Sequence, residues 1–349
     1  MEHETYHQQK NLENTLKLRE LLSELPRWIK DFFRGIEPTT ESRTRIAYAQ
    51  DLHTFFEFVI EVNPVYKNKT IPELPIELLS QMDSTDIEEY LEYLKAYKKD
   101  GKTITNNDRA IKRKLAALRT MYRYYFKTKV IKDNPVLLVD MPKIHEKAIV
   151  RLDVDEVADL LDVVETGNKL TTQQKIFHEK NKVRDLAMMT LLLGTGIRVS
   201  ECVGLDITDV DFNNSRIKVV RKGGYESYVY FGEEVQEALL EYLKERKTIS
   251  AVEGHENALF LSSRKSRISV RNVEIMVKKY AKTVTTLKKI TPHKLRSTYG
   301  TSLYQETGDI YLVADVLGHR DVNTTKKHYA AVEEERRRSA RNKVKLREK

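Results

Sequence analysis

Apolar residues recur at helical spacing through the first 130 residues of the chain. Between residues 42 and 59 they follow one another at intervals of 3, 3, 4 and 3, which places their side chains on one face of an amphipathic helix. Residues 16–33 predict another helix, interrupted near Pro26, and the acidic residues behind Ser84 predict a capped helix that runs through Tyr97 to Gly101. The first part of the chain is therefore expected to be helical.

A second apolar stripe runs through a basic segment. Its five members recur at intervals of 4, 3, 4 and 3 and predict a helix with one face against a core. They are Ile111, Leu115, Leu118, Tyr122 and Tyr125. The same helix carries basic residues that the spacing places on its flanks and outer face. These are Lys112, Arg113, Lys114, Arg119 and Arg123.

Pro135 and Pro142 bracket a short extended stretch that interrupts the helical pattern. It predicts a hinge between two domains, residues 1–145 and 146–349. Beyond it, β-branched and aromatic runs flank Lys222-Gly-Gly and predict a hairpin. Further helices are expected at residues 154–164, 182–196, 233–247, 269–284, 293–307, 310–319 and 323–332. The predicted fold class is mainly α, with a small antiparallel β-sheet in the second domain.

The location of charge adds a candidate surface to this picture. The 349 residues include 61 Lys and Arg against 52 Asp and Glu, a net charge of +9, and residues 102–132 hold ten basic residues and one acid. Solvated helices usually intersperse acids among their bases, so this excess favours contact with a nucleic-acid backbone over a solvated helix face. The residues expected to make that contact are Arg109, Lys112, Arg113, Lys114, Arg119 and Arg123.

Cysteine content and hydropathy exclude several classes of protein. The single cysteine, Cys202, excludes an intrachain disulfide, and no stretch approaches 18 uninterrupted apolar residues. The polar N-terminus has no apolar signal region, so a cytoplasmic protein without a membrane segment is expected. With one cysteine and no HExxH motif, no metal site and no cofactor are expected.

Charged residues of the second half occur in distinctive local settings. Arg198 follows the tetrapeptide GTGI, which predicts a glycine turn at the end of an apolar helix. The turn places Arg198 at the edge of a buried surface, where the next helix begins. Glu201 lies on the same helix face and can pair with it. Lys222 stands at the predicted hairpin turn, where a flexible ammonium can move onto a substrate. Arg221 is a weaker alternative, because an arginine does not give up its proton.

The remaining candidates complete a site for phosphate chemistry. His293 and Arg296 lie three residues apart after a helix-starting proline, so both project from one helical face. His319 follows a glycine in the run VLGH, and Tyr329 lies ten residues further on. Arginine forks can neutralise and orient a phosphate, lysine and histidine can move protons, and a phenol can act as nucleophile. These residue types together predict cleavage of a phosphodiester without a metal ion.

The order and settings of these residues resemble the tyrosine recombinases, the lambda-integrase and Xer type of DNA strand-exchange enzyme, from about residue 40 to 332. The resemblance implies a two-domain clamp on DNA, with a SAM-like helical core-binding domain and a mostly helical catalytic domain. It implies that Tyr329 forms a 3′-phosphotyrosine, that Lys222 protonates the released 5′-hydroxyl and that Glu201 has a supporting role. The catalytic set would be Arg198, Lys222, His293, Arg296, His319 and Tyr329.

The resemblance also implies partners. A chain that is monomeric when free would assemble as a homo-tetramer on two double-stranded recombination sites, and it would exchange strands through a Holliday junction without ATP. The interval from His319 to Tyr329 is one residue longer than in many Xer proteins, so His328 stands where those proteins have the nucleophile. Tyr329 is preferred, because a phosphohistidine linkage to DNA would be foreign to the family.

Two other functions compete with the recombinase. One is a catalytically silent DNA-binding accessory factor on the same fold, which the intact set of six catalytic residues disfavours. The other is a type IB topoisomerase that relaxes DNA without paired sites, which an N-terminal domain of Xer type disfavours. Among recombinases, chromosome dimer resolution and mobile-element integration or excision both fit the sequence.

Overall fold

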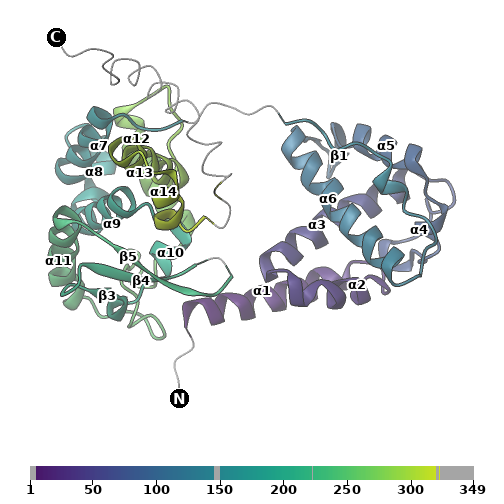
Figure 1. The fold of residues 1–349 in the computed structure, drawn as a ribbon, viewed down its shortest axis with the longest axis horizontal. Helices are drawn as coiled ribbons and strands as arrows, with labels where there is room; N and C mark the ends of the chain where they lie inside the picture. The colour runs from purple at the N-terminus through teal and green to yellow at the C-terminus, as the bar shows by residue number, and fades with distance from the viewer. Residues whose placement is uncertain (1–4, 145–149, 222, 320–321, 323–349) are drawn as a thin grey trace, which may run out of the picture. The chain divides into compact units, whose positions relative to one another are not determined.

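In a computed structural model the chain divides into two compact units, residues 1–147 and 148–349. The structure describes residues 5–144, 150–221, 223–319 and 322. Figure 1 shows the elements of the two units, which are called unit 1 and unit 2.

Unit 1 is helical with one small hairpin. Its helices are α1 (Tyr6–Ser23), α2 (Ile29–Ile36), η1 (Glu37–Thr39), α3 (Ser42–Val62), η2 (Ile71–Glu73), α4 (Leu78–Gln81), α5 (Ser84–Tyr93), α6 (Asp108–Lys127) and η3 (Pro135–Leu137). The two predicted apolar stripes lie in its core, where Leu52 and Phe56 of α3 and Leu115 and Tyr122 of α6 are all at most 1% exposed. The interruption predicted near Pro26 is confirmed, because the chain leaves helical structure between α1 and α2.

One helix prediction in unit 1 is wrong in its extent. Helix α5 ends at Tyr93 and does not reach Gly101. The next residues form an antiparallel hairpin of β1 (Ala96–Lys99) and β2 (Lys102–Thr105). Asp100 and Gly101 have φ angles of 49° and 72°, the left-handed conformation that a two-residue hairpin turn needs. This Asp-Gly pair ends the helical pattern that the preceding acidic residues suggest.

Lys114 lies inside unit 1 and not on the outer face of α6 where the spacing placed it. Its ammonium donates to Asp51 Oδ1 at 3.2 Å and to Thr54 Oγ1 at 3.4 Å, and all three side chains are buried. Arg113, which is half exposed, contacts the same Asp51 oxygen at 2.8 Å. Burial raises the pKa of Asp51, and the neighbouring Lys114 and Arg113 oppose that rise. A buried carboxylate on α3 therefore holds this lysine against the core.

Replacing Lys114 with methionine is expected to destabilise unit 1 by about 3–5 kcal/mol, because the buried Asp51 loses the buried one of the two cations that it contacts. The double variant Asp51→Leu/Lys114→Met should recover most of that loss, since similar-sized apolar groups can replace a buried ion pair at little cost. Urea unfolding followed by amide hydrogen exchange in α3 and α6 would measure both. Lys127→Met, at the exposed end of α6, is the control. Equal losses in the single and double variants would contradict the expectation.

Unit 2 contains the other helices and a three-stranded antiparallel sheet in the order β3-β4-β5 (Figure 1). Its elements are α7 (Val154–Thr166), α8 (Thr172–Glu179), α9 (Lys182–Thr195), α10 (Val199–Gly204), η4 (Ile207–Asp209), β3 (Val210–Asp211), β4 (Arg216–Val220), β5 (Glu226–Tyr230), α11 (Glu233–Lys247), α12 (Val270–Val284), α13 (Pro292–Thr307) and α14 (Ile310–Leu317). The hairpin and the helices predicted before residue 320 are confirmed. The sequence did not predict α8, and the helix predicted at 323–332 lies outside the described residues.

The sheet has one buried face. Ile217 pairs with Val229, and both are buried, as is Val219 two residues along β4. Successive strand residues point to opposite faces, so residue 221 falls on the same side as these apolar residues. This alternation directs the side chain of Arg221 inward.

Helix α8 is anchored to α12 by a buried polar chain. Nδ1 of His178 lies 3.1 Å from the hydroxyl of Tyr280, which donates to Asp185 Oδ2 at 2.8 Å. Arg184 donates to the other carboxylate oxygen of Asp185 at 2.6 Å. Burial, with a contribution from the positive charge of Lys279, lowers the pKa of His178.

This histidine predicts a pH dependence for the stability of unit 2. Because its folded pKa lies below the ordinary value of 6.5, the unfolded chain binds more protons between the two values, and stability falls as pH drops below about 6.5. Melting temperatures at pH 7.5, 6.5 and 5.5 should fall less steeply in His178→Phe than in the unaltered chain. His255→Phe, a partly exposed histidine of the same unit, should keep the original slope. Identical slopes in all three proteins would contradict the prediction.

Candidate active site

The candidate site begins at a sharp turn after α9. Gly196 has a φ of 62°, and a Cβ on it would lie 2.4 Å from the ring of Tyr299 and 2.9 Å from Leu317. No side chain fits there, so glycine is required by both conformation and space. Helix α10 begins directly afterwards, with Arg198 as its N-cap.

Arg198 and Glu201 form the ion pair that their spacing predicts. Arg198 Nη1 lies 2.8 Å from Glu201 Oε1, and the backbone N–H of Arg198 donates to Oε2 at 2.8 Å. The side chain of Glu201 is 2% exposed and that of Arg198 is 31% exposed. The buried carboxylate therefore holds one edge of the guanidinium, while another part remains accessible to a ligand.

Helix α13 supplies the second predicted arginine. Arg296 is buried, and its Nη1 donates to the carbonyl of Gly196 at 2.7 Å, while Nη2 donates to the carbonyl of Leu317. Leu295 is fully buried, as the pattern predicts, and His293 stands exposed in the first turn of the helix. Arg296 thus joins the turn after α9 to the end of α14.

The end of α14 brings the third predicted group. Gly318 ends the helix with a φ of 61°, and the backbone N–H of His319 donates to the carbonyl of Ala314 at 2.9 Å. Arg198 Nη2 donates to the carbonyl of Gly318 at 3.3 Å. The last carbonyls of a helix carry partial negative charge and lack helical partners, which explains why cations gather at this point.

An unpredicted arginine lies at the same place. Arg221 is buried and donates to Glu201 Oε2 at 3.3 Å and to the carbonyl of Val316 at 2.9 Å. From the sequence Arg221 is only a weaker alternative to Lys222, although the two-residue period of β4 already places it on the buried face. Arg198 and Arg221 share the carboxylate of Glu201, and Arg296 donates to the end of the same helix, α14. The excess positive charge at this point favours a phosphate.

Two of the six predicted catalytic residues, Lys222 and Tyr329, lie outside the described residues, as does His328. The hairpin turn on either side of position 222 is described. The N–H of Arg221 donates to the carbonyl of Tyr225 at 2.9 Å, and its carbonyl accepts from the N–H of Gly224 at 3.0 Å. Gly223 and Gly224 have φ angles of 99° and 83°, which explains the two glycines after Lys222. The structure thus brings Arg198, Arg296 and the backbone of His319 together at the end of α14.

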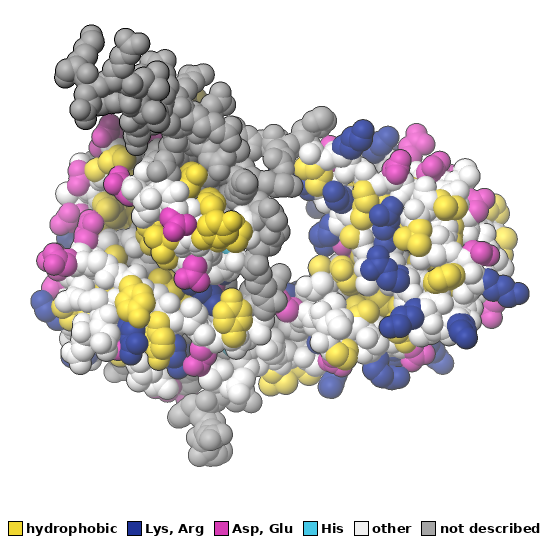
Figure 2. All heavy atoms as spheres, viewed as in Figure 1, with side chains coloured by type: hydrophobic (Ala, Val, Ile, Leu, Met, Phe, Trp, Pro, Cys, Tyr) yellow, Lys and Arg dark blue, Asp and Glu magenta, His cyan; other side chains and the backbone are white. Residues whose placement is uncertain are grey.

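The candidate nucleic-acid residues separate into two groups. Arg109, Lys112, Arg113 and Arg123 are exposed or partly exposed along α6, and Figure 2 shows Lys and Arg side chains over the face of unit 1 where α6 lies in Figure 1. Arg119 instead donates from Nε to the carbonyl of Val136 at 3.3 Å and from Nη2 to that of Val139, so it ties down the segment after α6. With Lys114 buried against Asp51 and the half-exposed Arg113 paired with the same carboxylate, three of the six predicted side chains have partners within the unit.

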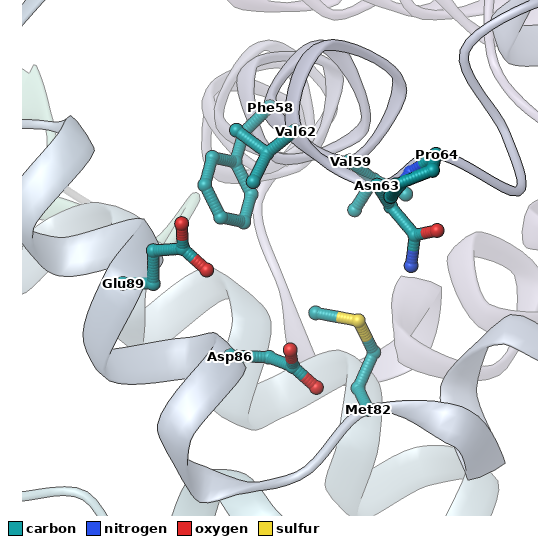
Figure 3. Close-up of a pocket in the computed structure, with 8 residues that line it drawn as sticks. All are labelled: Phe58, Val59, Val62, Asn63, Pro64, Met82, Asp86 and Glu89. Carbon is teal, nitrogen blue, oxygen red and sulfur yellow. The ribbon is translucent and has the colours of Figure 1, made fainter.

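A pocket of about 210 Å³ lies between α3 and α5 of unit 1 (Figure 3). Apolar side chains such as Phe58, Val62 and Met82 line it, and the carboxylates of Asp86 and Glu89 face it. These carboxylates would repel a phosphate, so the pocket does not share the DNA-binding function expected of the basic residues of α6.

No cluster of three or more His, Cys, Asp or Glu side chains suited to a metal ion occurs among the residues that the structure describes. Over the same ranges, none of the helices combines the length and the apolar character needed to cross a membrane.

Comparison with known proteins gives a consistent result. Residues 150–336 match the phage integrase family. The chain is 32% identical over 306 residues to the tyrosine recombinase XerC of Caldanaerobacter subterraneus subsp. tengcongensis, covering 85% of the chain and 80% of the relative. It is 30% identical over 348 residues to the tyrosine recombinase XerS of Streptococcus equi subsp. zooepidemicus, covering 92% and 96%. Among solved structures, XerH bound to a palindromic difH substrate in a post-cleavage complex shares the fold, with a TM-score of 0.67, 19% identity and coverage of 93% and 88%.

Proposed function

We propose that the active site of this chain is the cluster of Arg198, Arg296 and His319 at the end of α14. The chain belongs to the phage integrase family and is a Xer-like tyrosine recombinase, an enzyme that cleaves and rejoins DNA at specific sites. The observation that carries the proposal is the convergence of Arg198 and Arg296 on the carbonyls just before His319, with Arg198 held by Glu201. Segments about a hundred residues apart in the chain are joined there by side chains suited to a phosphate.

Cleavage proceeds by attack of Tyr329 on the scissile phosphate. Oη of Tyr329 forms a bond to phosphorus, its proton passes to His293, and the bond to the 5′-oxygen breaks. Lys222 donates a proton to that oxygen, so that a 3′-phosphotyrosine and a 5′-hydroxyl result. The two guanidinium groups of Arg198 and Arg296, with His319, stabilise the negative charge that grows on the non-bridging oxygens.

Rejoining is the same reaction in reverse. The 5′-hydroxyl of a partner strand attacks the phosphotyrosine, Lys222 takes its proton, and Tyr329 leaves as a phenol with the proton returned by His293. One phosphodiester is exchanged for another at each step, so neither ATP nor a metal ion enters the balance. Glu201 holds Arg198 in place through both directions.

The exposed basic side chains of α6 bind the DNA. Four protomers act together on two recombination sites, and the reaction takes place in the cytoplasm. The solved complexes of XerH with difH and of lambda integrase with a core site support a DNA partner for this fold. Xer relatives match across both units, which favours a recombinase over a topoisomerase or a silent accessory factor. Phosphate contacts by Arg109, Lys112, Arg113 and Arg123 would give affinity rather than sequence choice.

The test is the covalent intermediate itself. The unaltered chain should form a denaturant-resistant adduct on a nicked duplex whose half-site has been selected from random-sequence DNA by repeated binding. Peptide mapping of the digested adduct should place the nucleotide within residues 323–332. A chain that binds the selected duplex but gives no adduct on any strand would contradict the proposal, and relaxation of plasmids that lack the site would support the topoisomerase.

A further inference from the structure

Arg221 is a buried cation that the proposed chemistry does not use directly. It is the residue immediately before Lys222 and is 4% exposed, so it cannot move onto a substrate as a surface lysine can. A buried arginine at this position needs a reason, because an unpaired buried guanidinium is costly.

The side chain of Arg221 reaches three acceptors on two other elements. Nη2 donates to the carbonyl of Val316 at 2.9 Å, and Nη1 lies 3.4 Å from the carbonyl of Leu317 and 3.3 Å from Glu201 Oε2. Two of these acceptors end α14, and the third holds Arg198. A planar fork with several donors suits this arrangement, whereas an ammonium could serve only part of it.

The main chain of Arg221 closes the turn that contains Lys222. Its N–H donates to the carbonyl of Tyr225 and its carbonyl accepts from Gly224, at 2.9 and 3.0 Å. The same residue is therefore fixed to the base of the turn by its backbone and to the end of α14 by its side chain.

Gly318 completes this connection. A Cβ on Gly318 would lie 3.0 Å from both Cζ and Nε of Arg221, so the guanidinium packs directly on the backbone that precedes His319. A shift of the Arg221 side chain toward Gly318 would therefore require that backbone to move. The positions of the turn at 222 and of His319 are thus coupled through one side chain.

We infer that Arg221 is a positioning residue: it holds the turn that carries Lys222 against the end of α14 that carries His319, and against the Glu201 that holds Arg198. The inference rests on the proposed role of Lys222 as the proton donor to the 5′-oxygen. Proton transfer needs heavy atoms within about 2.6–3.2 Å of each other. Displacement of a catalytic group by about 1 Å can cost on the order of 100-fold in rate.

The test compares two leaving groups in the same protein. Single-turnover cleavage is measured on the selected nicked duplex and on the same duplex with a 5′-bridging sulfur at the scissile position. A thiol has a pKa of about 8.5, so the thiolate leaves without a proton, and a defect confined to proton donation disappears on that substrate. The variants are Arg221→Ala and Arg221→Lys, with Lys222→Ala as the reference for loss of the donor.

Arg221→Ala is expected to cleave the oxygen substrate about 100-fold more slowly than the unaltered chain and the sulfur substrate within a few-fold of it. Arg221→Lys should show an intermediate defect with the same preference. The ratio of the two rates does not depend on the fraction of folded protein, so partial unfolding of a variant leaves the result interpretable. DNA affinity should stay unchanged.

Arg246→Ala is the matched control. Arg246 is also 4% exposed and donates to the backbone carbonyls of Ala258, Ile249 and Glu256 at 3.1, 3.2 and 2.7 Å. Its loss should lower the melting temperature of unit 2 without changing the ratio of the two cleavage rates.

Equal losses on the two substrates in Arg221→Ala and Arg221→Lys would overturn the inference and leave Arg221 a purely structural cation. Failure of the proposed function gives a different result. In that case the unaltered chain forms no adduct on either substrate, or Lys222→Ala cleaves the oxygen substrate as fast as the unaltered chain.

Discussion

Replacing Tyr329 with phenylalanine is expected to abolish the covalent adduct, with a loss of cleavage rate on the order of 10⁴- to 10⁶-fold, the scale seen when a nucleophile is removed. Phenylalanine keeps the ring and removes only the oxygen that bonds to phosphorus. A free phenol has a pKa of about 10, so at neutral pH it needs the nearby positive charge and a base to attack. Gel electrophoresis under denaturing conditions, with end-labelled nicked DNA, measures the loss.

The matched variant is His328→Phe, because His328 stands where many Xer proteins have their nucleophile. It should retain the adduct, and DNA binding by both variants should equal that of the unaltered chain. Loss of the adduct in His328→Phe with retention in Tyr329→Phe would assign the nucleophile to the histidine. The linkage distinguishes the two chemically, since a phosphohistidine is lost in mild acid and a phosphotyrosine is not.

Most of the fold was predictable because its elements carry strong local signals. The stripes of α3 and α6 repeat at helical intervals, and every apolar member of the α6 stripe is buried. The GTGI turn before Arg198 was predictable from its two glycines. In the structure only glycine fits at position 196, between Tyr299 and Leu317. Local pattern and tertiary structure agree at these places.

The errors arise where a local signal has a competitor or a distant partner. At the end of α5 an Asp-Gly turn outweighs the helix-forming residues before it. Lys114 is drawn inward by Asp51, which is 63 positions away in the chain and follows no pattern visible near the lysine. Arg221 depends on carbonyls of α14 that come almost a hundred positions later. Side-chain roles that rest on long-range contacts therefore emerge only from the folded structure.

Replacing Arg198 with alanine is expected to slow strand cleavage by about 100- to 1,000-fold, the range found when one donor to a developing oxyanion is removed. Arg198 is 31% exposed and held by Glu201 on one edge, so a substrate phosphate can meet its remaining donors. Those donors gain most when the phosphate takes on charge in the transition state. Binding of the whole duplex, which depends on many phosphates, should change little. Arg198→Lys should recover only part of the rate, because an ammonium keeps the charge but not the fork.

Arg271→Ala supplies the control, because Arg271 is also paired with a glutamate three residues on, Glu274, at 3.5 Å, but is 77% exposed on α12. Loss of this exposed pair should leave cleavage unchanged, since surface ion pairs contribute little to stability. Single-turnover rates and duplex dissociation constants, measured at one salt concentration for the unaltered chain and the three variants, separate the possible outcomes. If the cleavage rate of Arg198→Ala falls only in proportion to its DNA affinity, Arg198 binds the ground state and the transition state equally. It then does not stabilise the charge that develops on the phosphate. A fall in rate at constant affinity assigns its contribution to the transition state.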